Sequence, residues 1–208
     1  MLIIAIAKGR LLKPSLAMLK DAGVELEEDA LTSRRLILNS RDSRYKVILV
    51  KPVDTPTYVE YGAADLGIAG NDVVIESGAD LFQPLDLRFG QCRIAVAALE
   101  DAKRKKRAGN PTVRVATKYP SIALEYFNSK SVPVEIIPLA GSIELAPLIG
   151  LADMIVDLVE TGQTLQDNGL KIVDVISESS ARLVINRASY QTKRQEVGAF
   201  VRALEELV

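Results

Sequence analysis

The sequence predicts an α/β protein of two lobes, with mainly parallel sheets and a central cleft. Short apolar runs alternate with amphipathic segments along the whole chain, which is typical of parallel strands joined by helices on both faces of a sheet. Many of these runs stop at glycine, serine, threonine or a basic residue. The pattern changes at residues 88–91, where Gly90 precedes a long strand-like run. We therefore expect the lobes to divide there, although periodicity does not assign the C-terminal segment to either lobe.

Periodicity and turn residues predict each element before this division. The run at 2–7 is apolar like a buried strand, and the segment 11–22 places leucines on one helical face before Gly23 ends it. Two later runs flank a polar turn at 40–43 and predict a hairpin. The expected elements are a strand at 2–7, a helix at 11–22, strands at 33–39 and 45–50, a helix at 57–61 preceded by Asp54-Thr-Pro56, a strand at 65–70 before a helix capped by Asn71 or Asp72, and a strand at 81–87.

Beyond residue 91 the same alternation continues to the C-terminus. The expected elements are strands at 93–99 and 113–116, a helix at 120–128, a strand at 134–139, a helix at 143–149, a strand at 152–159, a helix at 164–168, strands at 170–175 and 181–185, and a closing helix at 192–207.

The composition excludes several kinds of catalysis. With 208 residues, 48% of them hydrophobic, the chain can build a substantial core, and a formal net charge of −1 produces no overall attraction to polyanions. The chain has no histidine, which excludes a Ser-His-Asp triad, a Cys-His pair and a histidine-ligated zinc. The single cysteine, Cys92, lies in a strand-like run and is expected to pack inertly. Any chemistry must therefore depend on positioning and electrostatics.

Targeting and nucleic-acid signals are weak. The chain has no apolar run near the roughly 20 residues that span a bilayer, and its apolar N-terminus lacks the basic region of a signal peptide, so we expect a cytoplasmic protein. The residues at 103–107 are all basic but have no interleaved aromatic residues. We interpret them as a solvated loop.

The most informative stretch runs from Met154 to Leu165. It predicts a buried strand through Asp157, a Thr-Gly-Gln-Thr loop at 161–164, and a helix that begins near Leu165. The glycine permits close approach of an anion, and threonine hydroxyls and unpaired N–H groups at the helix start can donate to it. Asp157 could accept hydrogen bonds from sugar hydroxyls. The stretch predicts a sugar-phosphate site, although a plain turn with a helix N-cap explains the loop equally well.

Three other turns are candidates for ligand contact. Lys8-Gly9-Arg10 and Gly70-Asn71 follow predicted strands, and ligands of open α/β sheets bind at the carboxyl ends of strands. A solvated basic turn and a tight strand-to-helix turn are the competing explanations. The turn at 141–142 follows another strand and is expected at the same sheet edge as the 161–164 loop.

The motifs together resemble those of the ATP phosphoribosyltransferase family, which catalyses the first step of histidine biosynthesis. The residues from Glu144 to Leu165 match the family signature in spacing and type, including Gly150, Ala152 and Asp157. The resemblance covers essentially the whole chain, through Ala7-Lys-Gly-Arg-Leu11, Asp65-Leu-Gly-Ile-Ala-Gly70, Phe89-Gly-Gln-Cys-Arg93 and Ala116-Thr-Lys-Tyr-Pro120.

This resemblance implies a fold and an assembly. The fold is that of the type II periplasmic binding proteins, with residues 1–88 and about 178–208 in lobe I, including the closing helix, and residues 89–177 in lobe II. Because the sequence ends at Val208, it is similar to the short form of the family. The short form implies a separate regulatory subunit that resembles histidyl-tRNA synthetase, in a hetero-octamer.

The implied reaction joins N1 of ATP to C1 of phosphoribosyl pyrophosphate and releases pyrophosphate. The resemblance implies Mg²⁺ carried by the substrates, with no dedicated metal site. At most one of Arg34 and Arg35 is expected to reach a phosphate, because adjacent strand residues face opposite ways. The implied phosphoribosyl pyrophosphate site comprises Gly141, Ser142, Asp157, Glu160, Thr161, Gly162, Gln163 and Thr164; the nucleotide site comprises Lys8, Gly9, Arg10, Gly70 and Asn71; and the electrostatic catalysts are Lys8, Arg10 and Lys51.

Two rival functions remain at this stage. A non-catalytic solute-binding module would share the implied fold, because fold alone does not fix function. Another phosphoribosyltransferase with a different base would also fit the 161–164 loop, and only the whole-chain resemblance selects ATP.

Overall fold

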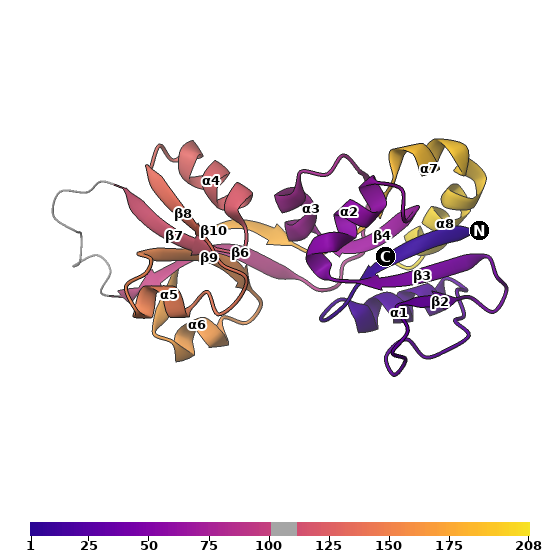
Figure 1. Cartoon of the computed structure of the whole chain (residues 1–208), viewed down its shortest axis with the longest axis horizontal. Helices are drawn as coiled ribbons and strands as arrows, with labels where there is room; N and C mark the ends of the chain where they lie inside the picture. The colour runs from indigo at the N-terminus through magenta and orange to yellow at the C-terminus, as the bar shows by residue number, and fades with distance from the viewer. Residues whose placement is uncertain (101–111) are drawn as a thin grey trace. The chain divides into compact units, whose positions relative to one another are not determined.

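A computed structural model describes residues 1–100 and 112–208 (Figure 1). The basic run at 103–107 lies outside the described residues. Contacts group the described chain into two compact units, Met1–Gln91 with Ser180–Val208, and Cys92–Ser179. The sequence predicts that the chain passes from one lobe to the other at residues 88/89 and about 177/178. In the structure these two chain boundaries lie at 91/92 and 179/180.

The first unit is built on a six-stranded sheet with the order β2-β3-β1-β4-β11-β5. Strands β3 and β4 are both parallel to β1, while β2, β11 and β5 join by antiparallel pairs. Its elements are β1 (Leu2–Ala7), α1 (Leu12–Asp21), β2 (Ile37–Asn39), β3 (Tyr45–Val50), the short 3-10 helix η1 (Pro52–Asp54), α2 (Thr55–Glu60), β4 (Leu66–Gly70), α3 (Asn71–Ser77), β5 (Phe82–Asp86), β11 (Ala181–Ile185), α7 (Arg187–Thr192) and α8 (Arg194–Glu205).

The second unit is built on a five-stranded sheet with the order β10-β6-β9-β7-β8. Strand β7 is parallel to both β8 and β9, and β6 pairs antiparallel with β9 and β10. Its elements are β6 (Cys92–Leu99), β7 (Val113–Thr117), α4 (Pro120–Ser129), β8 (Val134–Pro138), α5 (Leu145–Leu148), β9 (Met154–Val159), α6 (Gln163–Asp167) and β10 (Leu170–Ser179).

The sheets are therefore mixed, and the expectation of mainly parallel sheets is wrong. Parallel pairs form only where a helix crosses back over the sheet, and the hairpin β2-β3 and the returning strands β10 and β11 add antiparallel edges. The α/β class and the helix-covered sheets are confirmed. In the described part of the chain, no helix combines the length and apolarity needed to cross a membrane.

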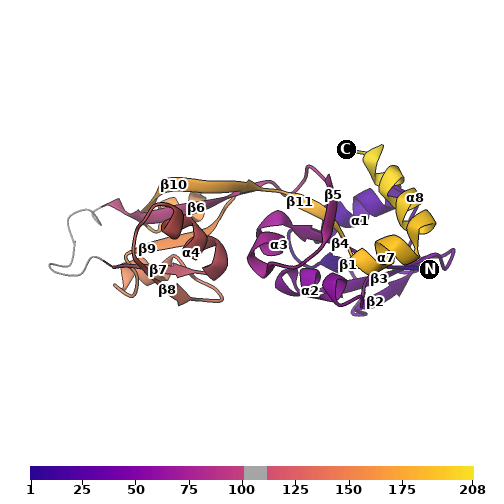
Figure 2. The same cartoon turned by 90° about the horizontal axis from the view of Figure 1, so that it is seen from above.

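The C-terminal helices belong to the first unit, as the resemblance implies. Val197, Phe200 and Leu204 of α8 are fully buried and join the core cluster formed by strands such as β1. The ring of Phe200 lies 5.6 Å from that of Tyr45, measured between centroids. Figure 2 shows α7 and α8 with the strands of this unit.

Asp65 connects these helices to the sheet. Its carboxylate accepts hydrogen bonds from Lys193 Nζ and from the Ile3 N–H, each 2.8 Å long, and one of 2.6 Å from Ser189 Oγ. Burial alone would raise the pKa of Asp65, but these hydrogen bonds outweigh it and lower the pKa. Lys193 lies between α7 and α8, so the expected single helix at 192–207 is two helices separated by the residue that binds Asp65.

Several other element limits differ from the expectations. The strand predicted at 33–39 is reduced to β2, because Asp29 forms a turn with Leu31 and Ser33 donates to Glu28. The helix predicted at 57–61 is α2, preceded by η1, and the helix predicted at 143–149 is only α5. The expected strand at 170–175 continues to Ser179 in β10. Cys92, the single cysteine of the chain, is buried, and its thiol donates to the Ser179 carbonyl over 3.7 Å, which agrees with inert packing.

Candidate functional site

Three loops meet at one edge of the second sheet. Strands β8 and β9 lie on either side of β7 and run parallel to it, so the carboxyl ends of all three strands share this edge. The turn at 141–142 follows β8, Lys118 follows β7, and the 161–164 loop follows β9. Ligands of α/β sheets bind at such edges, so we assign the candidate site of this unit here.

The 161–164 loop is a tight turn into a short helix. Gly162 has φ +83°, in the left-handed region that L side chains rarely adopt. The Gln163 N–H donates to Thr161 Oγ1 over 3.3 Å, and Gln163 Nε2 donates to Asp167 Oδ1 over 2.6 Å. The helix begins at Gln163 rather than near Leu165 and spans only 5 residues. Anion binding by this loop must therefore depend on its own N–H and hydroxyl groups more than on a helix dipole.

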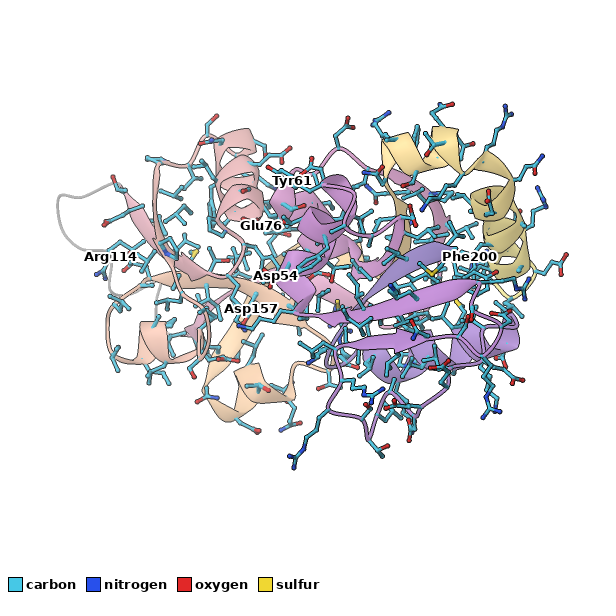
Figure 3. The ribbon with its side chains drawn as sticks, turned by 45° about the vertical axis from the view of Figure 1, so that its right-hand side comes forward. Asp54, Tyr61, Glu76, Arg114, Asp157 and Phe200 are labelled. Carbon is cyan, nitrogen blue, oxygen red and sulfur yellow. The ribbon has the colours of Figure 1, made fainter. Side chains whose placement is uncertain are left out.

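Asp157 lies near the end of β9 and is only partly exposed (Figure 3). Burial raises the pKa of this carboxyl above its ordinary value, and the nearby Glu144 raises it further. The Leu158 N–H, which donates to Asp157 Oδ1 over 2.8 Å, and the ammonium of Lys118 act in the opposite direction. The carboxylate is thus held in an unfavourable environment, which is typical of a functional group.

The turn at 141–142 is exposed and locally strained. Ser142 has φ +49°, which costs free energy for any residue other than glycine. Its carbonyl accepts a hydrogen bond from the Leu145 N–H over 3.1 Å, and this bond holds the turn against the start of α5. Glu160 is also exposed, directly before the 161–164 loop. Most residues of both loops are therefore exposed to solvent, and Gly162 is partly exposed.

The first sheet has a comparable edge with cationic residues. Strands β3 and β4 flank β1 in parallel, and Ala7 pairs with Val50 in the β1–β3 register. The next residues on these two strands are Lys8 and Lys51, both exposed, and the Lys8 N–H donates to the Val50 carbonyl over 2.9 Å. Two ammonium groups therefore leave neighbouring strand ends.

The other residues of the Lys8-Gly9-Arg10 turn have identifiable structural roles. Gly9 has φ +83°, which permits the turn from β1 into α1. Arg10 Nη1 donates to the Gly90 carbonyl over 2.8 Å, so its guanidinium is already engaged within the first unit. Its charge can still attract a nearby phosphate, because Coulomb attraction does not require a direct hydrogen bond.

Gly70 is the last residue of β4 and Asn71 the first of α3, at the same edge. A Cβ atom on Gly70 would lie 2.3 Å from Asp72 Oδ1, so glycine is needed there to accommodate the side chain of Asp72. The residue at the N-cap position of α3 is Gly70, so the capping role expected for Asn71 or Asp72 is wrong. The Asn71 N–H donates to the Ser180 carbonyl over 2.9 Å.

Arg34 and Arg35 lie outside β2, which starts at Ile37. The expectation that they alternate between the faces of a strand is therefore wrong. Arg35 Nη1 pairs with Glu28 Oε1 at 2.6 Å, and Arg34 is exposed. No reason remains to prefer either of them as a phosphate ligand.

Sequence reasoning did not select Lys118 or Glu144 as site residues. Lys118 lies within the motif Ala116-Thr-Lys-Tyr-Pro120, and Glu144 begins the stretch that matches the family signature. Lys118 also directly follows a strand, as Lys8 does. The buried Thr117 hydroxyl fixes the turn that carries Lys118, because it donates to the Val156 carbonyl over 2.7 Å and accepts from the Tyr119 N–H over 2.8 Å. Sequence alone could have found Lys118 as a cation at a strand end.

Two α/β units, each with loops at the carboxyl edge of parallel strands, give the chain a fold like that of the type II periplasmic binding proteins. The fold is similar to that of an amino-acid ABC transporter extracellular-binding protein, ytmK, from Bacillus subtilis, with a TM-score of 0.58, 12% identity and coverage of 99% of this chain and 90% of the other. The model of the HisG family, ATP phosphoribosyltransferase, matches residues 51–206. The chain belongs to the ATP phosphoribosyltransferase family.

Individual relatives agree with this assignment. An ATP phosphoribosyltransferase of Geobacter metallireducens is 47% identical over 100% of this chain and 98% of its own length. One from Acidithiobacillus ferrooxidans is 48% identical over 99% and 96%. A solved Thermotoga maritima structure, titled as an ATP phosphoribosyl transferase (HisG:HisZ) complex, aligns with a TM-score of 0.85 and 38% identity over 99% of this chain and 98% of the other. The chain is a glycosyltransferase of the first step of histidine biosynthesis, and a non-catalytic binding module is not favoured.

Proposed function

We propose that the 161–164 loop, the 141–142 turn and Asp157 hold phosphoribosyl pyrophosphate for transfer of its phosphoribosyl group to N1 of ATP. The observation that carries this proposal is the shared carboxyl edge of β8, β7 and β9, where N–H and hydroxyl donors lie beside one carboxylate. The loop would bind the 5′-phosphate through Thr161, Gly162, Gln163 and Thr164, and Asp157 with Glu160 would accept hydrogen bonds from the ribose hydroxyls.

Electrostatic stabilisation is the proposed role of the first unit. Its Lys8 and Lys51 would neutralise pyrophosphate and ATP phosphates, Arg10 would add its positive charge, and Gly9, Gly70 and Asn71 would lie near the nucleotide. The lone pair of adenine N1 forms the bond to C1, and the C1–O bond breaks with its electron pair on pyrophosphate. Adenine N1 is unprotonated near neutral pH, so the step requires no general base, in agreement with a chain that lacks histidine.

Mg²⁺ would be carried by substrate oxygens. The described residues contain no group of three or more Asp, Glu, His or Cys side chains able to hold a metal ion. Mg²⁺ keeps several of its waters and usually binds one or two carboxylates together with substrate phosphates, so substrate oxygens and water would supply most of its ligands. We therefore propose no protein ligand for the metal and no step that depends on one.

A regulatory partner is proposed from the Thermotoga maritima relative, whose structure is titled as a HisG:HisZ complex. By this similarity, the chain would assemble with a subunit that resembles histidyl-tRNA synthetase, in a hetero-octamer. The cytoplasm, which supplies ATP, is the proposed compartment.

The function is tested by pyrophosphate release from the purified chain mixed with ATP, phosphoribosyl pyrophosphate and Mg²⁺, with and without the regulatory subunit. We expect release that depends on both substrates. Absence of release in the complete mixture would reject the proposed activity. Release without ATP would instead indicate hydrolysis.

Asp157→Asn is expected to weaken phosphoribosyl pyrophosphate binding by about tenfold, the effect of losing roughly 1.5 kcal/mol of hydrogen bonding to a charged group. The same change should raise the melting temperature of the unliganded protein at pH 7. Because the folded-state pKa of Asp157 is raised, ionisation of this carboxyl opposes folding above its unfolded pKa, and asparagine removes that cost. Calorimetric titration and thermal melting measure the two effects.

The matched control is Asp21→Asn, an exposed aspartate at the end of α1. It should leave binding unchanged and raise the melting temperature only slightly, because it removes a negative charge from a helix C-terminus. If Asp157→Asn lowered the melting temperature and left binding intact, Asp157 would be a structural residue and the proposed role would be wrong.

A further inference from the structure

A hollow of about 540 Å³ lies in the first unit beside α1. The last turns of α1 and the segment 24–30 form its walls, and Arg41 borders it from the turn between β2 and β3. Its volume is within the range of roughly 300–1,000 Å³ that is usual for ligand pockets. Figure 1 shows α1 and the chain that follows it near β2. None of the residues proposed above for substrate binding lines this hollow.

The hollow has an apolar floor. Leu19 and Val24 are buried in the core cluster, and Leu16 and Leu26 pack against it while remaining partly exposed. A floor of this kind accommodates a large apolar side chain, and burying such a side chain contributes roughly 1.5–3 kcal/mol. The surface is therefore suited to an anchor residue.

The rim of the hollow is acidic. Glu25, Glu27, Glu28 and Asp29 line it, against two cationic side chains, Lys20 and Arg41. Glu28 is paired with Arg35, and the carboxylate of Asp29 accepts bonds from Leu31 and Thr32.

The remaining two carboxylates, on Glu25 and Glu27, are exposed, and neither makes a side-chain hydrogen bond or ion pair with any described residue. The main chain that carries them is fixed, because the Glu27 N–H donates to the Asn39 carbonyl and the Arg41 N–H donates to the Glu25 carbonyl. Two exposed carboxylates on either side of Leu26 favour a ligand with positive charges around an apolar group.

The hollow lies toward the amino ends of the parallel strands, whereas the candidate nucleotide residues lie at their carboxyl ends. Helix α1 starts after the Lys8-Gly9-Arg10 turn and runs back, so its last turns lie toward the amino end of β1. The Leu2 N–H at that end donates to the Arg44 carbonyl, in the turn that includes Arg41. A macromolecule bound in the hollow would leave the carboxyl edge of this sheet open to substrates.

From this combination we propose that the hollow docks a cationic segment of the regulatory subunit, with one large apolar side chain on its floor and Lys or Arg residues beside Glu25 and Glu27. This inference rests on the proposed function for the existence of that subunit. It adds to that function the surface of this chain that the subunit would bind and the chemistry of the contact.

The experiment measures the affinity of the full chain for the purified regulatory subunit at about 50 mM and about 300 mM salt, across which screening of exposed charges increases strongly. Glu25→Gln with Glu27→Gln should weaken association about tenfold at low salt and reduce its salt dependence. The control, Glu205→Gln with Glu206→Gln, removes the same charge from exposed residues at the end of α8 and should leave both unchanged.

Thermal melting of each variant checks that it is folded, which is expected because all four residues are exposed. Equal affinities for wild type and the Glu25/Glu27 variant, or no association of the wild type, would overturn the docking proposal. Pyrophosphate release by the wild type, measured in the same mixtures, reports on the catalytic function separately. If the wild type releases pyrophosphate and the Glu25/Glu27 variant binds the subunit as tightly as the wild type, the chain is active and binds the subunit through another surface.

Discussion

Replacing Gly162 with valine should weaken phosphoribosyl pyrophosphate binding by about 100-fold, the loss of roughly two charge-assisted hydrogen bonds from the loop. Gly162 has φ +83°, and a β-branched residue in this region is strained by about 1–3 kcal/mol. The added Cβ would lie 3.7 Å from Val159 Cγ1, an ordinary contact. The effect therefore arises from backbone conformation, because the loop must rotate and its N–H groups no longer converge. Calorimetric titration of the purified variant measures the affinity.

Gly169→Val is the matched control for this prediction. Gly169 follows the other end of the same short helix with φ +69°, and a Cβ there has no neighbour within 4 Å. Both substitutions introduce similar strain, so both should lower the melting temperature by comparable amounts. Only Gly162→Val should weaken binding of the sugar phosphate. Equal affinities for the two variants would show that the 161–164 loop does not hold the phosphate.

The features that the sequence predicts correctly are local. The strands at 2–7, 45–50 and 181–185 match β1, β3 and β11 residue for residue, because each is an apolar run bounded by turn residues. The 161–164 loop is predicted because Gly162 and its flanking threonines specify a turn by themselves. Strand direction is different, since it depends on which strands pair, and nothing in β10 or β11 indicates that they return antiparallel.

The site residues that were missed depend on contacts between distant segments. Lys118 acts on Asp157 because Thr117 pairs with Val156 in the β7–β9 register, which no periodicity reveals. Conversely, Gly70 is expected from the sequence to lie near the nucleotide, but a Cβ at this position would lie 2.3 Å from Asp72 Oδ1, so local packing by itself requires glycine there. A glycine after a strand is therefore ambiguous until its neighbours are known.

Lys193, which separates α7 from α8, forms an ion pair with the buried carboxylate of Asp65. Lys193→Met should destabilise the folded protein by about 2–3 kcal/mol at pH 7, because it removes the cationic partner of the buried Asp65 carboxylate while the hydrogen bonds from Ser189 and Ile3 remain. Asp65 is only 4% exposed and lies directly before β4, but the side chain of Lys193 is 37% exposed, so water that takes the place of the ammonium recovers part of the loss. Urea denaturation of the two proteins measures the difference.

The pH dependence distinguishes this mechanism from simple loss of packing. Since the folded-state pKa of Asp65 is lowered, its contribution to stability is present above the ordinary carboxyl pKa and is lost as pH falls through the folded value. The difference between wild type and Lys193→Met should therefore shrink in acid. Lys171→Met, which removes an exposed pair with Glu100, should cost less than about 1 kcal/mol at either pH. A Lys193→Met penalty that stayed constant below pH 4 would show that the lysine stabilises the helix junction by its methylene contacts, and that the ion pair with Asp65 contributes little.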